Sequence, residues 1–152
     1  MAVKYYNDSC SYRLPMKRAT AAWLREVASR EGYTLGDVNY IFCSAERLLE
    51  MNKQFLSHDY FTDIITFDYS DRRGTKIIAG DIFIDVETVA DNARIYGATP
   101  LEEMRRVVVH GVLHLCGQGD KTPRTEAQMH RKEDRYLKLF AETFDTKNVV
   151  KQ

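Results

Sequence analysis

Apolar residues recur at every third or fourth position in five segments of the chain, a spacing that predicts amphipathic helices. The breaks between these segments carry helix signals. Pro15, Pro100 and Pro123 stand at helix starts, and Gly97 and Gly117 follow helix ends. We therefore expect five helices, at about residues 15–30, 45–55, 86–96, 100–116 and 123–144.

Aromatic and β-branched residues gather in the segments between these helices, which is typical of strands. Residues 38–43 and 63–69 are two such segments, and a third runs from 76 through Gly80 to 84. The stretch 71–74 favours a hairpin turn, and the glycine within the third strand indicates a bulge or a close backbone approach. The whole pattern predicts an α+β fold: one domain, residues 1–152, with a small mixed four-stranded sheet packed with about five helices.

Composition and charge narrow the function classes. The chain has 152 residues, of which 44% are hydrophobic and 29% charged, as in ordinary globular proteins. No apolar run approaches the roughly 18–20 residues of a membrane helix, so we expect no membrane contact. Lys plus Arg and Asp plus Glu both number 22, which excludes a globally basic nucleic-acid binder. Contact with a polyanion would need a local basic patch.

Cysteine usage indicates the compartment. Cys10, Cys43 and Cys116 are sparse and odd in number, which favours free thiols in a reducing environment. The first eight residues lack the apolar core of a signal peptide. We therefore expect a cytoplasmic protein.

The helix that ends at Cys116 carries the candidate chemistry. Residues 107–116 are apolar except for His110 and His114, which leave the same helix face one turn apart. That spacing suits two ligands of one divalent metal, although such pairs are often ordinary polar residues with satisfied hydrogen bonds. Glycines 117 and 119 let the chain fold back, so that Asp120 can approach the same point. These residues predict a Zn²⁺ site on a buried helix, with His110, His114 and Asp120 as ligands and a fourth position open.

The residues around this site resemble the YbeY family, metal-dependent endoribonucleases that mature ribosomal RNA. The segment 110–117, HGVLHLCG, is similar to the family's His-Gly-x-x-His-Leu-x-Gly signature. Segments 62–67 and 80–84 are similar to its Thr-Asp and Gly-Asp-Ile strands, and 51–55 to its Leu-Asn-x-x-Tyr helix. Glu126, Met129 and Glu133 fit its last helix. The resemblance spans about residues 51–137 in the family's order.

Several positions depart from the family pattern. Asp120 stands where the family has a third histidine, and an Asp oxygen can replace a His nitrogen on zinc. Leu56 stands where the family has an arginine for substrate or catalysis, and Phe61 where it has a proline. Lys53 and His58 are nearby candidates for the missing cation.

Other residues have two possible roles each. His130 is a possible fourth ligand or a solvated residue, and Cys116 is core filler. Asp63 and Asp81 either orient the imidazoles or cap turns. Nine basic residues could line an RNA path or be scattered surface charges: Arg72, Arg73, Lys76, Arg105, Arg106, Lys121, Arg124, Arg131 and Lys132. Of these, Arg105 and Arg106 lie about one turn before His110, so we expect charge reversal there to weaken RNA binding without removing metal.

The resemblance implies a zinc-dependent endoribonuclease acting on single-stranded ribosomal RNA and on ribosomal particles, with His110 and His114 as catalytic metal ligands. It implies roles in 3′-end maturation of the small-subunit RNA and in ribosome quality control, and no DNA substrate. A zinc peptidase is a second possibility, but Gly111 stands where its glutamate base belongs, and only a residue such as Glu133 could replace it. A non-catalytic ribosome-assembly factor is a third, favoured by Leu56. The sequence leaves the oligomeric state open.

Overall fold

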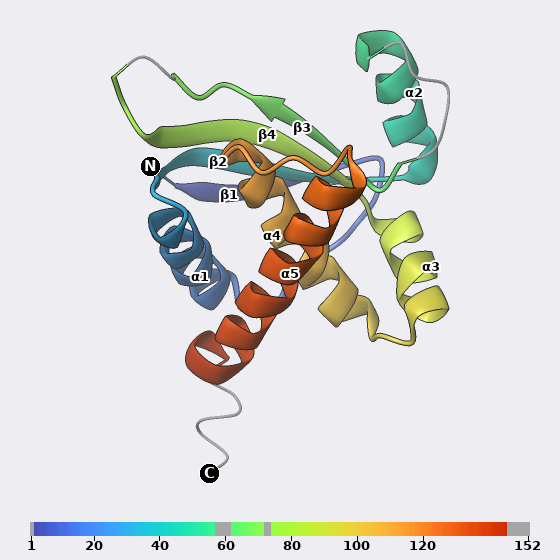
Figure 1. The fold of residues 1–152 in the computed structure, drawn as a ribbon. Coiled ribbons are helices and arrows are strands. Elements are labelled where there is room, and N and C mark those ends of the chain that lie inside the picture. The colour runs from blue at the N-terminus through green and yellow to red at the C-terminus, as the bar shows by residue number, and fades with distance from the viewer. Residues whose placement is uncertain (1, 57–61, 72–73, 146–152) are drawn as a thin grey trace.

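The computed structural model of the chain describes residues 2–56, 62–71 and 74–145. Its strands and helices alternate in the first half, and helices dominate the second half (Figure 1). The elements are β1 (Val3–Asp8), α1 (Lys17–Arg30), β2 (Thr34–Cys43), α2 (Ala45–Leu56), β3 (Ile64–Asp68), β4 (Ile77–Asp85), α3 (Val86–Tyr96), α4 (Pro100–Leu115), α5 (Pro123–Leu139) and a last π-helical turn (Phe140–Phe144). The predicted α+β class, with five helices and a mixed four-stranded sheet, is confirmed.

The four strands lie in the order β1-β2-β4-β3. β1 and β4 both pair with β2 in parallel, whereas β3 runs antiparallel to β4, as the predicted hairpin requires. β1 is the strand that the sequence analysis did not assign. Only Val3 and Tyr5 of this edge strand pack against the core, so its pattern is mostly polar.

Two of the three predicted proline starts are confirmed. Pro100 and Pro123 occupy the first turns of α4 and α5, and Thr99 and Thr122 close capping boxes in front of them. Pro15 instead lies before α1, which begins at Lys17.

Most helices lie on one side of the sheet. α1, α4 and α5 pack below it in Figure 1, and their apolar faces join the inner side chains of the strands in one core. α2 lies on the other side, where Leu48 and Met51 form a smaller cluster with Cys43 and Ile65. α4 is the central helix, and nine of its residues are buried. In the described part of the chain, no helix combines the length and apolarity needed to cross a bilayer.

Two glycines let α4 approach the sheet closely. A Cβ atom at Gly111 would lie 2.8 Å from Ile82 Cδ1, and one at Gly80 would lie 2.5 Å from the Phe67 carbonyl oxygen and 2.9 Å from Leu115 Cδ2. The predicted close approach at Gly80 is therefore present. The predicted bulge is also present beside it, because the register of β2 and β4 shifts between Leu35 and Val38, and Val38 pairs with Gly80; the extra residue belongs to β2. Close packing of α4 holds the histidine-bearing turns at a fixed height over β3.

Candidate metal centre

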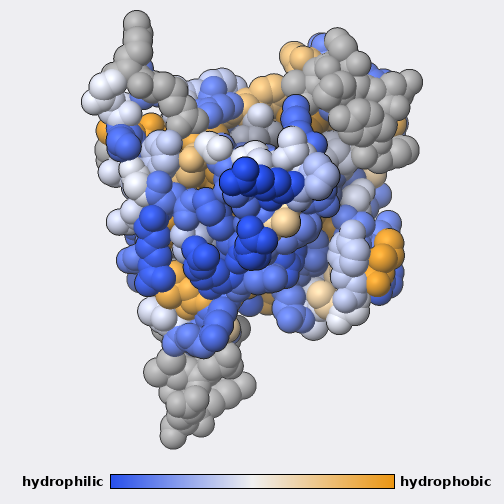
Figure 2. Space-filling model, in the orientation of Figure 1, coloured by the Kyte–Doolittle hydropathy of each residue, from blue (hydrophilic) through white to orange (hydrophobic). Residues whose placement is uncertain are grey.

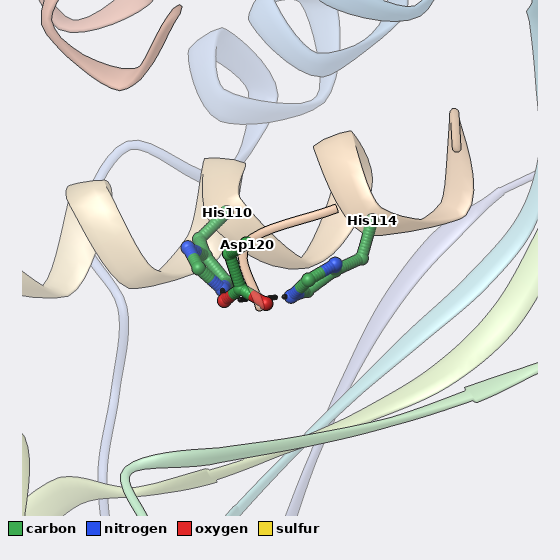
Figure 3. A group of neighbouring side chains, drawn as sticks. All are labelled: His110, His114 and Asp120. Carbon is green, nitrogen blue, oxygen red and sulfur yellow. Dashed lines mark ion pairs between the residues drawn. The ribbon is translucent and has the colours of Figure 1, made fainter. Parts of the chain in front are cut away.

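Three predicted site residues meet beside the last two turns of α4. His110 and His114 project from one face of the helix, and the loop after Gly117 brings Asp120 between their rings (Figure 3). Asp120 Oδ2 lies 3.4 Å from the Nε2 atom of each histidine. One donor atom from each residue lies within 4.8 Å of the others, a group that could hold a metal ion. The predicted convergence of these residues is thus present.

His110 is oriented by a charged network. Its Nδ1 lies 2.6 Å from Oε2 of Glu133, a residue of α5 that is only 2% exposed. Arg106 donates to the other Glu133 oxygen at 3.0 Å and to Asp134 at 2.7 Å. Burial raises the pKa of Glu133, but its hydrogen bonds and ion pairs with His110 and Arg106 outweigh burial and lower the pKa. Glu133 is therefore an anion that accepts the Nδ1 proton of His110.

His114 is oriented by the backbone. Its Nδ1 lies 2.9 Å from the carbonyl oxygen of Gln118. Since a carbonyl oxygen can only accept, the proton of neutral His114 is on Nδ1. Gly117 has a φ of 90°, a left-handed conformation that suits glycine and turns the chain back toward His114.

The two imidazoles have opposite pKa shifts. Burial lowers the pKa of His110, but the hydrogen bond and charge of Glu133, followed by the charges of Asp120 and Asp63, raise it above the usual value. Burial and the charge of His110 lower the pKa of His114. His114 is thus the more readily neutral of the two, as a metal ligand must be.

These hydrogen bonds make the site suited to a cation. In their neutral forms both histidines carry their proton on Nδ1, so both Nε2 lone pairs point toward the Asp120 carboxylate, which is itself an acceptor. Three acceptors facing one point repel one another unless a cation or a proton lies between them. Two imidazole nitrogens and a carboxylate oxygen form a donor set that zinc favours, with room for a fourth ligand.

Two clefts meet at this point. One, of about 540 Å³, has six acidic residues among its fifteen lining residues, including Glu103, Glu126 and Asp134, against one arginine, Arg106; we call it the acidic cleft. The other, of about 560 Å³, is lined by β3 and by Asn52, Leu115 and Lys121. His110, Asp120 and Asp63 line both. The donor set is therefore open to solvent and to a substrate from two sides.

The other residues that the sequence suggested for the site differ in their distance from the three-donor group. Asp63 lines both clefts near His110, and burial raises its pKa against the charge of His110. Asp81 instead accepts a hydrogen bond from Asn39 Nδ2 at 3.0 Å and lines neither cleft, so it does not orient an imidazole. Cys116 is buried in the core, as expected. The side chain of His130 is 61% exposed and lies 3.3 Å from Glu133 Oε1, outside the three-donor group.

The predicted substrate cations are arranged differently from the expectation. Arg106 is paired with Glu133 and Asp134, and the guanidinium of Arg105 stacks 4.3 Å from the centre of the Phe140 ring. Both arginines are therefore already engaged within the protein. Lys53 is exposed on α2. His58 and Phe61 lie outside the described residues, as do Arg72, Arg73 and the side chain of Leu56.

Glu133 is the functional residue whose role the sequence did not reveal. It was a candidate base for a peptidase, whereas the structure makes it the partner of His110. A signal was present, because Glu133 shares the apolar face of α5 with Met129 and Tyr136. A carboxylate on such a face requires a buried partner.

An accessible His-His-Asp group between two clefts could hold a metal ion, and such a group suits a metal-dependent hydrolase. The family model described as Endoribonuclease YbeY matches residues 5–141. The chain is 44% identical to Endoribonuclease YbeY of Parabacteroides distasonis, over 93% of this chain and 98% of that protein. It is 45% identical to the protein of that name from Cytophaga hutchinsonii, over 89% of this chain and 93% of that one. A Thermotoga maritima protein solved in solution superposes with a TM-score of 0.63, at 27% identity over 93% of this chain and 91% of that one. The chain belongs to the YbeY endoribonuclease family.

Proposed function

We propose that the chain, as one domain of residues 1–152, is a zinc-dependent endoribonuclease that cleaves single-stranded ribosomal RNA. We place it in the cytoplasm, on ribosomal particles, in 3′-end maturation of the small-subunit RNA and in ribosome quality control. Family membership supports the RNA-cleaving activity. The observation that carries the metal dependence is the meeting of three acceptor atoms, from His110, His114 and Asp120, at one accessible point.

In this proposal, those three residues hold the zinc. When bound, the metal would polarise a phosphate oxygen of the RNA and acidify water at its open position. Glu133 keeps the proton of His110 on Nδ1, and the Gln118 carbonyl does the same for His114, so that both Nε2 atoms stay available. Asp120 adds a negative charge that a third histidine would not add, which favours a dication over a proton at the site.

The peptidase alternative fits the structure poorly. Its glutamate base would stand at position 111, where even a Cβ atom would lie 2.8 Å from Ile82 Cδ1. Glu133 cannot replace that base, because its two oxygens are held by His110 and Arg106 on the side of the imidazole away from Asp120.

The test is cleavage of a labelled ribosomal RNA fragment that contains the 3′ end of the small-subunit RNA. We expect cleavage by the zinc-loaded protein, loss of cleavage with a chelator, and recovery when zinc is added back. His114→Ala should be inactive in a preparation purified in parallel. Equal cleavage in all samples would reveal a contaminating nuclease. Absence of cleavage in every sample, with ribosome association intact, would contradict the proposal and favour the assembly factor, and cleavage of casein would favour the peptidase.

A further inference from the structure

Helix α5 separates its charges by sign. At 3.6 residues per turn, Arg124, Arg131 and Arg135 lie on one narrow stripe of the helix, about 16 Å long from the first to the last. Lys132 and Lys138 flank this stripe. We call the three arginines and two lysines the basic face. Glu126, Glu133 and Asp134 lie on the other side, where they line the acidic cleft.

The basic face is exposed except for Lys132, which is half-buried. Arg131, Lys132 and Arg135 line a shallow hollow of about 230 Å³ together with Gln118 and Gln128. Figure 2 shows that hydrophilic residues dominate the surface over α5. Lys132 is paired with Glu31, and Lys138 lies 3.9 Å from Glu142. Arg135 hydrogen-bonds to the Tyr136 hydroxyl group. Among the described residues, no carboxylate lies within 4.0 Å of a guanidinium nitrogen of the three arginines, so no acid neutralises their charges and they can meet a polyanion.

The chain as a whole has equal numbers of acidic and basic residues, so the positive charge of this face is a local feature of α5. Arg131 and Arg135 are four residues apart, a spacing at which like charges repel along a helix. A negatively charged partner would relieve this repulsion. The acidic cleft on the other side of α5 would repel the same partner, so the two sides together set the route by which a polyanion can reach the site.

The basic face is also next to the metal centre. Gln118 forms a wall of the hollow, and its carbonyl oxygen accepts from His114 Nδ1. Its side-chain nitrogen lies 3.4 Å from the amide oxygen of Gln128, the other glutamine of the hollow. Lys121, one residue after Asp120, lines the cleft bounded by β3. Positive charge therefore continues from that cleft across the loop to the start of α5 at Arg124.

We propose that the basic face of α5 binds the phosphodiester backbone of the single-stranded RNA substrate, beside the scissile bond and outside the acidic cleft. The inference rests on the proposed RNA-cleaving function and adds the path of the strand. Contact is with phosphates, so it is independent of base sequence and sensitive to salt. The arginines act as binding residues and leave the metal site unchanged.

The experiment compares the full chain with Arg124→Gln/Arg131→Gln/Arg135→Gln. A control with the same charge change, Arg13→Gln/Arg18→Gln/Arg25→Gln, removes exposed arginines in and before α1. The probe for binding is a fluorescent, 2′-O-methylated single strand of about 16 nucleotides, which keeps the phosphates. Its Kd is measured from about 50 to about 200 mM salt. Metal content of each variant is measured in parallel.

We expect the α5 variant to bind the strand at least about tenfold more weakly at low salt. The slope of log K against log salt concentration should become shallower by about 2, because each lost phosphate contact contributes ~0.7. Its metal content should stay normal, and the α1 control should bind like the unaltered protein. Arg124→Lys/Arg131→Lys/Arg135→Lys should keep most of the slope, because a point charge suffices for a phosphate.

An unchanged Kd and slope in the α5 variant would overturn the proposal, and so would an equal loss in the α1 control. Loss of ribosome association with unchanged RNA binding would overturn it too, because the face would then contact an acidic protein. Failure of the proposed function is recognised separately: the unaltered protein would not cleave the unmethylated strand, whereas binding would still depend on α5.

Discussion

His110 and His114 lie one turn apart on the same helix, yet the two are held by different kinds of group. The Nδ1–H group of His110 meets a buried carboxylate, Glu133, which comes from another helix and is itself paired with Arg106. The Nδ1–H group of His114 meets a backbone carbonyl four residues further along the chain. We call the group that accepts the Nδ1 proton of a histidine its holder. The holder of His110 is charged and is brought there by tertiary packing, whereas the holder of His114 is a neutral group close by in the sequence.

The difference has a consequence for the two ligands. A carboxylate partner makes an imidazole more basic and can be removed by a single substitution. A carbonyl partner survives any substitution of its own side chain and depends instead on the conformation of the loop. The His110 side of the site should therefore be sensitive to side-chain changes, and the His114 side to changes in backbone conformation.

The largest effect is expected from the variant that tests whether the two histidines are metal ligands. His110→Ala/His114→Ala removes both Nε2 donors and should abolish stoichiometric zinc, measured by plasma mass spectrometry on protein purified without chelator. His130→Ala, which removes an exposed histidine of α5, should keep its metal. Stoichiometric zinc in the double variant would show that the site is elsewhere.

Asp120 lies close to both histidines, and its substitution should have the second-largest effect on zinc binding. Asp120→Ala removes the oxygen that faces both Nε2 atoms and should weaken zinc binding by about 10–100-fold or more, since even losses around the ligands reach that range. Asp120→His restores a nitrogen donor and should keep the metal. A competition titration with a fluorescent zinc chelator measures both. Unchanged affinity in Asp120→Ala would remove this residue from the site.

Glu133→Gln tests the charged holder alone. Its amide oxygen can still accept from His110, but the charge is lost, so zinc binding should weaken by about tenfold. In metal-free protein, the pKa of His110 should fall, because the hydrogen bond and the charge of Glu133 are the main causes that raise it. The His110 imidazolium would then form only at lower pH.

Proton NMR titration of the imidazole signals measures this change. In the unaltered metal-free protein, the pKa of His110 should lie above the usual histidine value and the pKa of His114 below it. If Glu133→Gln changed the pKa of both imidazoles by the same amount, the two holders would not act independently.

The sequence predicted that the three candidate ligands converge, but it did not predict the groups that hold the two imidazoles. His110, His114 and Asp120 follow from helix periodicity and from glycine turns, both of which are local. The pairing of His110 with Glu133 joins residues 23 positions apart, and only the packing of α4 against α5 brings them together. Strand β1 was not predicted for a related reason. It is a strand because it pairs with β2, and its own mostly polar pattern does not indicate one. The same limit applies to Arg106. The sequence predicts its position on the helix one turn before His110, but it does not predict its carboxylate partners on α5.

Arg106→Met tests how far the charged network extends. Without Arg106, Glu133 loses one of the two partners that lower its pKa, so zinc binding should weaken by only a few-fold, less than in Glu133→Gln. This differs from the expectation drawn from sequence, in which a change here would affect RNA binding alone. Measuring zinc affinity and RNA affinity on the same preparation separates the two. A change in RNA affinity only would restore the sequence expectation.

The smallest effect is expected on the other side of the site, from Gln118→Ala. The carbonyl oxygen that accepts from His114 remains, and the side-chain contacts to Gly119, Thr125 and Gln128 are lost, so zinc affinity should stay within about threefold, well below the range for lost holders. Gly117→Ala is the matched contrast. A Cβ there would meet nothing closer than Tyr33 Oη at 3.9 Å, but the φ of 90° is unfavourable for alanine by about 1–2 kcal/mol. Because this strain moves the loop that carries the carbonyl and Asp120, Gly117→Ala should weaken zinc binding more than Gln118→Ala does. The reverse order would mean that the Gln118 side chain, and not the backbone conformation, holds His114.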